Sequence, residues 1–515
     1  RMGNMSNIYI TTPIYYVNDK PHVGHAYTSI ASDVLARFYR LKNYEVFFLT
    51  GTDEHGQKIQ QATKNNNLNT QEFVDSMSLN FQNLTKTLNL SNNDFVRTSS
   101  QRHIEAVRTF WKKLNDNGQI YLDKYSGWYS IRDEAFYNED EIIDGLAPTG
   151  APVEWVEESS YFFKLSEWEE KLLKFYSDNP TFIQPKSRYN EVVSFVKQGL
   201  KDLSISRTSF DWGVKVPGDE SHVVYVWIDA LTNYLTALGY PNNESKPLND
   251  FWPANFHFVG KDILRFHAVY WPALLMAAGM DLPRKIIAHG WWTVEKEKMS
   301  KSLGNVVDPQ DIINKYGLDQ FRYFLLREVP FGNDGDFSED ALISRINSEL
   351  ANNFGNLVNR VFSMTKKSLN GVIPEQQELK EEEQNLINIC DENLSEYMVC
   401  FKSVEFSKAI DSVVGIISMT NKYIDNTKPW ALAKEGKVED LKRVLRVSLE
   451  VIRLVSILFY PIIPSSSIKI LKALNLSIDE EANCFAGPGS VASLVANDTI
   501  GDLDLLFPKI DKNLT

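Results

Sequence analysis

The first sixty residues show two hydrophobic patterns. Residues 8–12 and 45–50 are short, β-prone apolar runs, and apolar side chains recur at helical spacing from near Gly24 to Phe38. The first run ends at Pro13, and Gly51 stops the second. Two strands around one helix predict a parallel sheet with a right-handed crossover connection.

A change of pattern near residue 115 predicts an inserted domain. Aromatic, acidic and turn-forming residues crowd the segment 115–222. The apolar runs 223–227 and 256–259 are then typical of buried strands, so we expect the sheet to resume there. The sequence thus predicts an α/β fold in which residues 7–114 and 223–305 are the two halves of one parallel-sheet domain.

Beyond residue 344 the pattern is almost entirely helical. The apolar positions between 444 and 455 share one helical face, with charged residues opposite. This predicts a helical domain over residues 344–515, joined to the sheet domain by residues 306–343. A chain of 515 residues has room for several domains, because single cores rarely grow past about 250–300 residues.

Charge and cysteine content narrow the function classes. The formal net charge is −13, which counts against a broad nucleic-acid surface but leaves room for one local site. Cys390, Cys400 and Cys484 form no CxxC pair, so neither a disulfide framework nor a thiolate zinc site is indicated. We see no secretory leader, and the most apolar stretch, 454–463, is about half of the ~20 residues that span a bilayer. We expect a soluble, cytoplasmic protein with no membrane partner.

Histidines gather beside glycine-containing turns that follow predicted strands. Six of the eight do so, namely His22, His25, His55, His257, His267 and His289. Ligands of open α/β sheets bind at the carboxyl ends of strands. We therefore expect these rings at one ligand-binding edge rather than in the core.

Residues 21–25 read Pro-His-Val-Gly-His, between the first predicted strand and the first helix. Unpaired amides at a helix N-terminus suit phosphate. Gly24 would allow close approach, and His22 and His25 can both donate to the same phosphates. Taken alone, so short a match is more readily a surface turn.

Residues 298–302 read Lys-Met-Ser-Lys-Ser, with Gly304 following. Lys298 and Lys301, with two hydroxyls, could clamp a polyphosphate, and a solvated basic loop is the alternative. Together, however, the HxGH and KMSKS segments resemble the paired signatures of class I aminoacyl-tRNA synthetases. We see no Walker-type GxxxxGK[ST], GxGxxG, HExxH or GxSxG motif that competes with this interpretation.

The rest of the chain resembles the methionyl-tRNA synthetase family from end to end. Residues 11–18 resemble its opening strand, 51–56 its acidic turn, 225–230 its pocket strand and 260–267 its next loop. The resemblance implies a Rossmann-like catalytic domain with a connective insertion, a stem-contact region and an α-helical anticodon-binding domain. It also implies ATP-dependent formation of methionyl-adenylate from L-methionine and transfer to methionine tRNA, both initiator and elongator.

The same resemblance assigns roles to residues. Asp53 would hold the substrate ammonium. The methionine side chain would be walled by Pro13, Ile14, Tyr16, Trp227, Ala230, Leu231, Tyr234, Ile263 and His267. A thioether is apolar and polarisable, so aromatic faces and shape sense it best; taken singly, each aromatic is more readily a core residue.

The resemblance also implies an ATP site. ATP would contact His22, Gly24, His25, Gly260, Asp262, His289, Met299 and Lys301. With Mg²⁺, the groups that stabilise the leaving pyrophosphate would be His22, His25, Lys298, Lys301 and Arg207.

Asn352, Asn356 and Arg360 fall at i, i+4 and i+8, so they are predicted to share one helical face. Trp430 follows Pro429 after another helix. In the family the matching residues read the CAU anticodon, by edge hydrogen bonds and stacking; surface amides and a buried tryptophan are the alternative. Such a site needs little positive charge, so we expect a modest, salt-sensitive affinity for tRNA.

Many family members carry CxxC zinc knuckles in the insertion, but residues 126–137 contain no cysteine. This segment resembles the zinc-free form, so we expect no structural zinc and aromatic packing in its place. The family's C-terminal dimerising extension has no counterpart here, and we expect a monomer.

Two alternatives stay open: a class I synthetase for another amino acid, and a non-catalytic tRNA-binding paralogue. Synthetases for isoleucine, valine and leucine need a large editing insertion, because one methylene discriminates by only about 1–3 kcal/mol, and a cysteine-specific enzyme would use zinc thiolates. A non-catalytic tRNA-binding paralogue would not need the two phosphate-binding segments.

Overall fold

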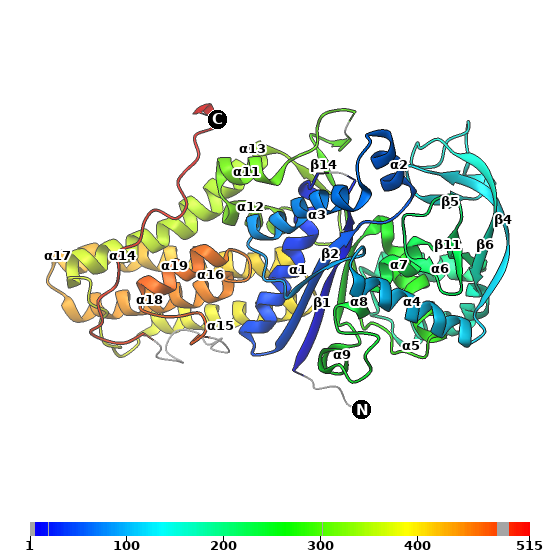
Figure 1. Ribbon diagram of the computed structural model, residues 1–515. Coiled ribbons are helices and arrows are strands. Elements are labelled where there is room, and N and C mark those ends of the chain that lie inside the picture. The colour runs from blue at the N-terminus through cyan, green and yellow to red at the C-terminus, as the bar shows by residue number, and fades with distance from the viewer. Residues whose placement is uncertain (1–5, 19, 301, 482–493, 515) are drawn as a thin grey trace. The chain divides into compact units, whose positions relative to one another are not determined.

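The computed structural model describes residues 6–18, 20–300, 302–481 and 494–514. These residues form two compact units. The first combines the chain up to Pro21 with Val46–His289, and the second combines His22–Glu45 with the chain from Gly290 onward. Figure 1 labels the elements of both units.

A six-stranded sheet organises the first unit, in the order β3-β2-β1-β12-β13-β7. Its strands are β1 (Asn7–Tyr16), β2 (Glu45–Asp53), β3 (Asp94–Arg97), β7 (Ile183–Gln184), β12 (Phe256–Gly260) and β13 (Ile286–His289). Strand β1 pairs in parallel with β12, β12 with β13, β13 with β7, and β2 with β3. The predicted parallel sheet is confirmed.

Two predicted strands differ from those observed. Strand β1 does not end at Pro13 but runs on to Tyr16, because the fixed φ of proline is compatible with an extended chain. The run 223–227 is divided between β11 (Asp219–Val224) and α7 (Val226–Leu231), so the prediction that the central sheet resumes there was wrong. A short apolar run cannot be assigned to strand or buried helix by periodicity alone.

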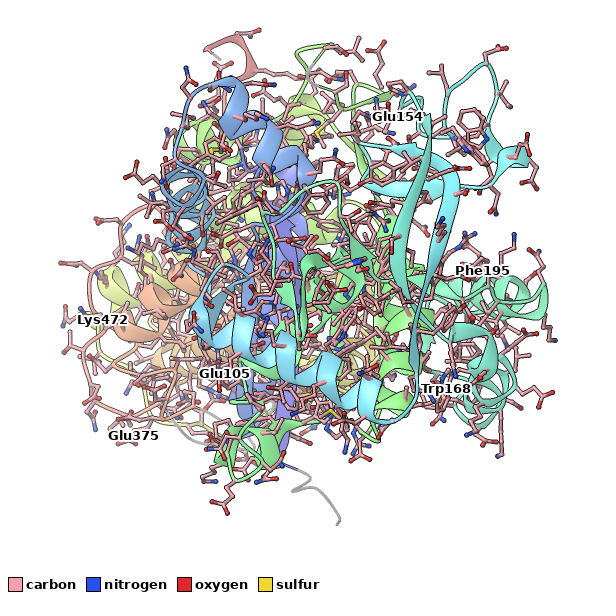
Figure 2. All side chains as sticks on the ribbon, turned by 45° about the vertical axis from the view of Figure 1, so that its right-hand side comes forward. Glu105, Glu154, Trp168, Phe195, Glu375 and Lys472 are labelled. Carbon is pink, nitrogen blue, oxygen red and sulfur yellow. The ribbon has the colours of Figure 1, made fainter. Side chains whose placement is uncertain are left out.

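The inserted segment is built around a long antiparallel hairpin. Strands β4 (Ile120–Ser130) and β6 (Glu154–Phe163) pair along their lengths, and Figure 2 shows Glu154 where β6 begins. Two short strands, β5 (Ala135–Tyr137) and β8 (Leu203–Ser204), flank them. A second small sheet contains β9 (Ser206–Arg207), β10 (Lys215–Val216) and β11.

Helices surround these sheets within the first unit. They are α2 (Gln57–Asn65), α3 (Thr70–Thr87), α4 (Gln101–Asp116), α5 (Glu169–Asp178), α6 (Lys186–Lys197), α7, α8 (Asn233–Thr236), α9 (Lys246–Phe251) and α10 (Trp271–Ala277). Shorter turns are η1 (Glu139–Glu141), η2 (Leu165–Trp168), η3 (Lys261–Ile263) and the π-helical η4 (Phe266–Tyr270). Helix α4 shows why these helices pack as they do: His103, Val107, Phe110 and Leu114 recur at helical spacing and are buried.

The second unit contains α1 (Val23–Leu41), a small sheet and the C-terminal helices. The sheet orders β15 (Glu297–Lys298), β14 (Trp292–Val294) and β16 (Gly335–Phe337). The helices are α11 (Pro309–Tyr316), α12 (Leu318–Arg327), α13 (Glu339–Arg345), η5 (Ile346–Gly355), α14 (Asn356–Leu369), α15 (Glu381–Lys402), α16 (Phe406–Thr427), α17 (Pro429–Lys434), α18 (Val438–Phe459), α19 (Pro464–Ala473) and η6 (Lys512–Leu514). The predicted helical C-terminal region is confirmed.

A buried ion pair attaches α1 to the rest of the second unit. Arg322 of α12 donates to Asp33 at 2.6 Å and to the carbonyls of Pro461 and Ile462 at 3.0 and 2.8 Å. Both side chains of the pair are fully buried, so removing either partner would leave an uncompensated charge. Within the described residues, none of the helices combines the length and apolarity that a membrane span requires.

Candidate active site

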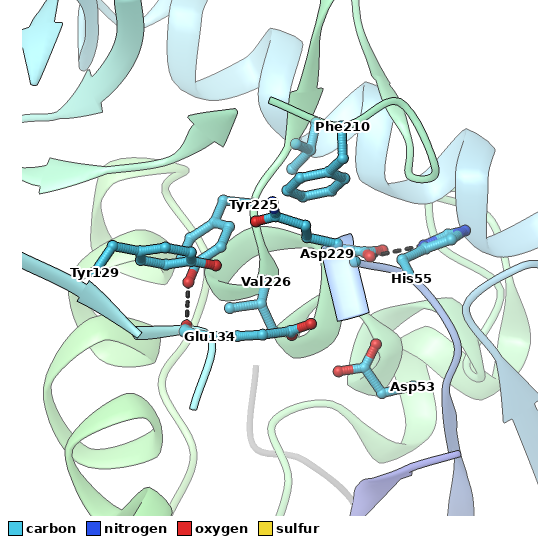
Figure 3. A pocket seen from close by; sticks show the side chains of 11 residues that line it. Asp53, His55, Tyr129, Glu134, Phe210, Tyr225, Val226 and Asp229 are labelled. Carbon is cyan, nitrogen blue, oxygen red and sulfur yellow. Dashed lines mark hydrogen bonds and ion pairs between the residues drawn. The ribbon is translucent and has the colours of Figure 1, made fainter. Parts of the chain in front are cut away.

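A small polar pocket lies in the first unit, where β2 ends and the inserted segment turns back (Figure 3). It encloses about 320 Å³ of empty space, including its opening. Its lining residues are Asp53, His55, Gly56, Gln57, Tyr129, Glu134, Phe210, Val224, Tyr225, Val226 and Asp229. Asp53 was predicted for this site, whereas Glu134 and Asp229 were not.

Asp229 is held as a carboxylate by two histidines. Its oxygens lie 2.8 Å from Nδ1 of His55 and 3.1 Å from Nε2 of His103, whose Nδ1 lies 2.9 Å from the hydroxyl of Thr236. Burial alone would raise the pKa of Asp229, but the two histidines lower it well below its usual range. The carboxylate of Asp229 is therefore hydrogen-bonded within the protein.

Asp53 differs, because no cationic side chain of the described residues forms an ion pair with it. Its side chain is buried, and burial, then the negative charges of Asp229 and Glu134, hold its pKa well above the ordinary range. A buried carboxylate next to other carboxylates favours a bound cation. The pocket is thus suited to an ammonium group.

An apolar cluster in the same unit gathers most of the predicted methionine-pocket residues. Trp227 packs against Phe266 and Tyr270, with ring centroids 4.4 and 5.2 Å apart. The hydroxyl of Tyr234 lies 2.6 Å from Nε2 of His267. Ala230 and Leu231 continue α7 beside Trp227.

The hydrogen bonds of His267 fix its tautomer. Nδ1 lies 3.1 Å from the carbonyl of Ile263, which can only accept, so Nδ1 carries the proton and Nε2 accepts from Tyr234. Burial lowers the pKa of His267 to about 4, so the ring is neutral at neutral pH. Both polar groups are therefore satisfied within the protein, and what remains for a ligand is largely apolar.

The predicted methionine-pocket residues of β1 lie near the C-terminal end of the strand. Ile14 packs where Gly51 leaves space, since a Cβ at Gly51 would lie 3.1 Å from its Cγ2 and closer still to the Val96 carbonyl. Tyr16 donates to Glu134 at 2.6 Å. Pro13 precedes Ile14 and lies beyond the residues of β1 that register with β12.

One predicted site histidine is a core residue. His257 lies within β12, fully buried, with Thr11 at 2.6 Å from Nδ1 and the indole of Trp271 donating to Nε2 at 3.3 Å. The expectation that it faces a ligand was wrong, because both of its nitrogens are used within the core.

The HxGH segment lies in the second unit and begins α1. Nδ1 of His22 accepts from the amide of Gly24, and Nδ1 of His25 accepts from the amide of His22, each at 3.0 Å. Because each Nδ1 accepts, a neutral ring carries its proton on Nε2, which makes both rings donors at that atom. Burial, and then the neighbouring His22, hold the pKa of His25 well below its usual range.

The prediction that the amides of this helix N-terminus are open to phosphate was wrong. The amide of Val23 donates to the carbonyl of Val307 at 3.1 Å, and that of Gly24 is capped by His22. Gly24 is required for the cap itself, since a Cβ there would lie 2.8 Å from Cε1 of His22. Phosphate contacts from His22 and His25 would therefore use ring Nε2 groups.

The KMSKS segment follows β15 in the same unit. Lys298 is exposed, with its ammonium 5.2 Å from the ring of Trp291. The amide of Ser300 donates to Asn305 at 2.9 Å, and Gly304 has a φ of 65°, so the loop folds back on itself. Met299 is partly buried; Lys301 lies outside the described residues.

The other predicted ATP residues belong to the first unit. Gly260 ends β12 and His289 ends β13, two adjacent strands whose registered pairs include these two residues. A Cβ at Gly260 would lie 2.5 Å from Oδ1 of Asp262, so the Asp262 carboxylate lies close against this glycine. The three residues thus meet at one strand end.

Arg207 lies in an aromatic enclosure. Its guanidinium carbon is 3.9, 4.4 and 5.6 Å from the ring centroids of Tyr225, Phe136 and Tyr129, and its side chain is buried. A direct contact with pyrophosphate would require this side chain to leave the enclosure. Aromatic pairs also fill the hairpin that lacks cysteines, among them Trp128 with Trp155 at 5.3 Å.

The predicted anticodon residues lie on three elements of the second unit, η5, α14 and α17. Arg360 pairs with Asp425 at 2.6 Å, and its guanidinium carbon is 5.8 Å from the ring of Trp430. Trp430 is 49% exposed, so the alternative of a buried tryptophan does not apply. Asn352 and Asn356 are exposed, but Asn352 lies in the π-helical η5, so their spacing is not that of a regular α-helix.

Comparisons with known proteins place these features in one family. A family model described as tRNA synthetases class I (M) matches residues 8–152 and 147–362, and one described as the anticodon binding domain of methionyl tRNA ligase matches residues 373–514. The methionine–tRNA ligase of Rickettsia conorii is 52% identical over 512 residues, 98% of this chain and 99% of the relative. That of Rhizobium meliloti is 49% identical, covering 99% of each.

Solved structures agree with the sequence relatives. Mycobacterium tuberculosis methionyl-tRNA synthetase in complex with methionyl-adenylate matches with a TM-score of 0.94 at 46% identity, over 98% of this chain and 100% of that one. Its apo form matches with a TM-score of 0.88 at 42% identity, over 99% of each chain. Since both the family models and the full-length relatives point the same way, this chain belongs to the methionyl-tRNA synthetase family of class I aminoacyl-tRNA ligases.

Proposed function

We propose that this chain activates L-methionine with ATP and transfers it to methionine tRNA through the residues described above. The observation that carries the proposal is the pairing of Tyr234 with His267, in which each polar atom already has a partner. A side-chain pocket with satisfied polar groups and the aromatic face of Trp227 suits a thioether, which neither donates nor accepts strongly. Specificity then comes from shape and polarisability.

Asp53 would bind the α-ammonium of methionine. The substrate carboxylate is ionised at neutral pH, since α-carboxyl pKa values lie near ~3.3–3.7. It can attack the α-phosphorus of ATP without a general base. Catalysis of this step is then positioning together with stabilisation of the charge on pyrophosphate.

His22, His25, Lys298 and Lys301 would supply that stabilisation as donors and cations. These nitrogen groups suit phosphate oxygens, whereas Mg²⁺ prefers oxygen ligands and is bound largely by substrate phosphates. Mg²⁺ would therefore arrive with ATP and neutralise part of its charge. Gly260, Asp262, His289 and Met299 would line the nucleotide.

In the second step a terminal ribose hydroxyl of tRNA attacks the adenylate. Arg360 and Trp430 would read unpaired anticodon bases, the tryptophan by stacking and the arginine by edge hydrogen bonds, and their mutual approach supports this. Asn352 and Asn356 add amide donors and acceptors on the same part of the chain. We further propose a cytoplasmic, zinc-free monomer that serves both initiator and elongator tRNA.

ATP–pyrophosphate exchange against all twenty amino acids tests this function. We expect exchange with methionine alone, followed by charging of methionine tRNA. Exchange with another amino acid would identify a different class I specificity. No exchange, with tRNA binding retained, would identify a non-catalytic paralogue.

A further inference from the structure

The turn that joins β4 to β5 in the inserted segment reaches the pocket of Asp53. Ser130 ends β4 and registers with Ala135, which begins β5, so residues 131–134 form the turn. Glu134 has a left-handed φ of 48° and contributes its carboxylate to the pocket. Figure 3 shows the carboxyl groups of Asp53 and Glu134 directed into the same space.

Contacts from several elements hold Glu134 in place. The hydroxyl of Tyr225 donates to its carbonyl, and the hydroxyl of Tyr16 donates to its Oε1 at 2.6 Å. The amide of Lys58 approaches the same Oε1 at 3.4 Å. Gly56 leaves the necessary room, since a Cβ there would lie 2.7 Å from Oε1. The carboxylate is therefore positioned by the walls of the pocket.

The charges around the pocket are unbalanced. The Asp229 carboxylate is already bound by two ring nitrogens, Nδ1 of His55 and Nε2 of His103. Neither Asp53 nor Glu134 has a cationic side chain within ion-pair distance among the described residues, although the charges of Lys58 and Arg207 act on Glu134 from farther away. Burial raises the pKa of Glu134, as it does that of Asp53. Two such carboxyl groups lining one small pocket favour a cation between them.

We propose that Glu134 is a specificity-determining residue that, together with Asp53, receives the α-ammonium of the amino acid substrate. The proposal rests on the assignment of Asp53 to that ammonium. The inserted segment then contributes directly to substrate choice, because it supplies the carboxylate of Glu134. This residue lies in the same hairpin that carries no cysteine. A primary ammonium is the ligand class that two carboxylates select, and an amino acid analogue without that group is rejected.

The test uses the full chain and two ligands that differ in the group of interest. Methioninol keeps the ammonium and lacks the carboxylate, whereas 4-(methylthio)butanoate keeps the carboxylate and lacks the ammonium. Binding of both and of methionine is measured calorimetrically, together with KM and kcat in pyrophosphate exchange. The variants are Glu134→Gln, which retains an acceptor for Tyr16, and Tyr16→Phe. Glu139→Gln, an exposed carboxylate of the same segment, is the matched control.

We expect Glu134→Gln to weaken methionine and methioninol about 10-fold or more, to raise KM for methionine with little change in kcat, and to leave 4-(methylthio)butanoate unaffected or bound more tightly. Tyr16→Phe removes one contact that positions the Glu134 carboxylate and should show a smaller loss with the same dependence on the ammonium, whereas Glu139→Gln should match the wild type. If Glu134→Gln is poorly folded, Glu134→Asp, which keeps the charge on a shorter side chain, should show a smaller loss with the same dependence on the ammonium.

Equal loss of all three ligands or no loss in Glu134→Gln, or an ammonium-selective loss of the same size in Glu139→Gln, would overturn the proposal. These outcomes are separate from failure of the proposed function. In that case the wild type itself would show no methionine-dependent exchange, whatever the behaviour of Glu134→Gln.

Discussion

The HxGH and KMSKS segments of the second unit and the predicted methionine pocket of the first are built in different ways. The two segments are short, contiguous and polar, with Lys298 exposed and both histidines presenting Nε2 donors. The predicted pocket takes its residues from β1, β2, α7, α8, η3 and η4, and the polar atoms of Tyr234 and His267 are used internally. Recognition of charge needs a few adjacent donors, whereas recognition of an apolar side chain needs a wall built from distant parts of the chain.

The largest expected effect belongs to the polar segments. Lys298→Ala should lower kcat of pyrophosphate exchange about 10²–10³-fold, because a donor that stabilises transition-state charge is lost. KM for methionine should barely change, since the pocket lies in the other unit. Lys296→Ala, an exposed lysine two residues away, is the control. An equal decrease in both variants would mean that general charge, and not Lys298, is responsible.

The pocket should show the opposite kinetic pattern. Tyr234→Phe removes the donor to Nε2 of His267 and leaves a buried acceptor unsatisfied, at a cost of about 1–3 kcal/mol. KM for methionine should rise about 10- to 100-fold with KM for ATP unchanged, and discrimination against homoserine, whose hydroxyl could donate to the freed Nε2, should fall. Tyr240→Phe, another tyrosine of this unit, should behave as wild type. A change in kcat alone would refute the assignment.

Trp430 allows a comparison within the second unit. Trp430→Ala should lower kcat/KM for tRNA about 10- to 100-fold, because stacking on an aromatic contributes about 1–3 kcal/mol per base. Pyrophosphate exchange without tRNA should be unchanged, and Trp430→Phe should recover part of the loss. Val438→Ala, at an exposed apolar position on α18, serves as the control. Loss of exchange in Trp430→Ala would indicate a structural role.

The pH dependence of methionine binding gives a smaller effect. Burial, Asp229 and Glu134 raise the pKa of Asp53 above that of an ordinary aspartate, which is about 3.9. On acidification Asp53 therefore takes up its proton at a higher pH. Each proton removes an ammonium partner, so KM for methionine should rise on acidification, beginning at a higher pH than an ordinary aspartate would cause. His267 should not contribute above a pH of about 4. Asp53→Asn should give a high KM with a flatter profile; a flat wild-type profile would contradict this account.

Local patterns predicted much of this structure. Residues 23–41 and 45–53 form the expected helix and strand because their spacing alone distinguishes them. The contiguous motifs indicated His22, His25 and Lys298, and the roles of these residues stay predictions. The solvent exposure of the Trp430 ring and its approach to Arg360 agree with the anticodon-binding role that the resemblance implied.

Features that depend on distant partners could not be predicted. His257 is a core residue only because Thr11 and Trp271 bond both of its nitrogens. Arg207 is enclosed because Tyr225 and Phe136 reach it from other elements. Glu134 was one acidic residue among many in the insertion, and nothing local indicated that its turn folds into the pocket.

The hydrogen bond from the amide of Val23 to the carbonyl of Val307 can be removed by proline at position 23. Val23 is the first residue of α1, where proline is tolerated, and His22 before it is extended, as a residue preceding proline must be. Val23→Pro would therefore keep the helix and delete only the backbone link to the chain that follows KMSKS, with Val23→Ala correcting for lost packing. Its effect on exchange should add incompletely to that of Lys298→Ala. A backbone hydrogen bond, present before any nucleotide binds, would then couple the positions of the HxGH and KMSKS segments.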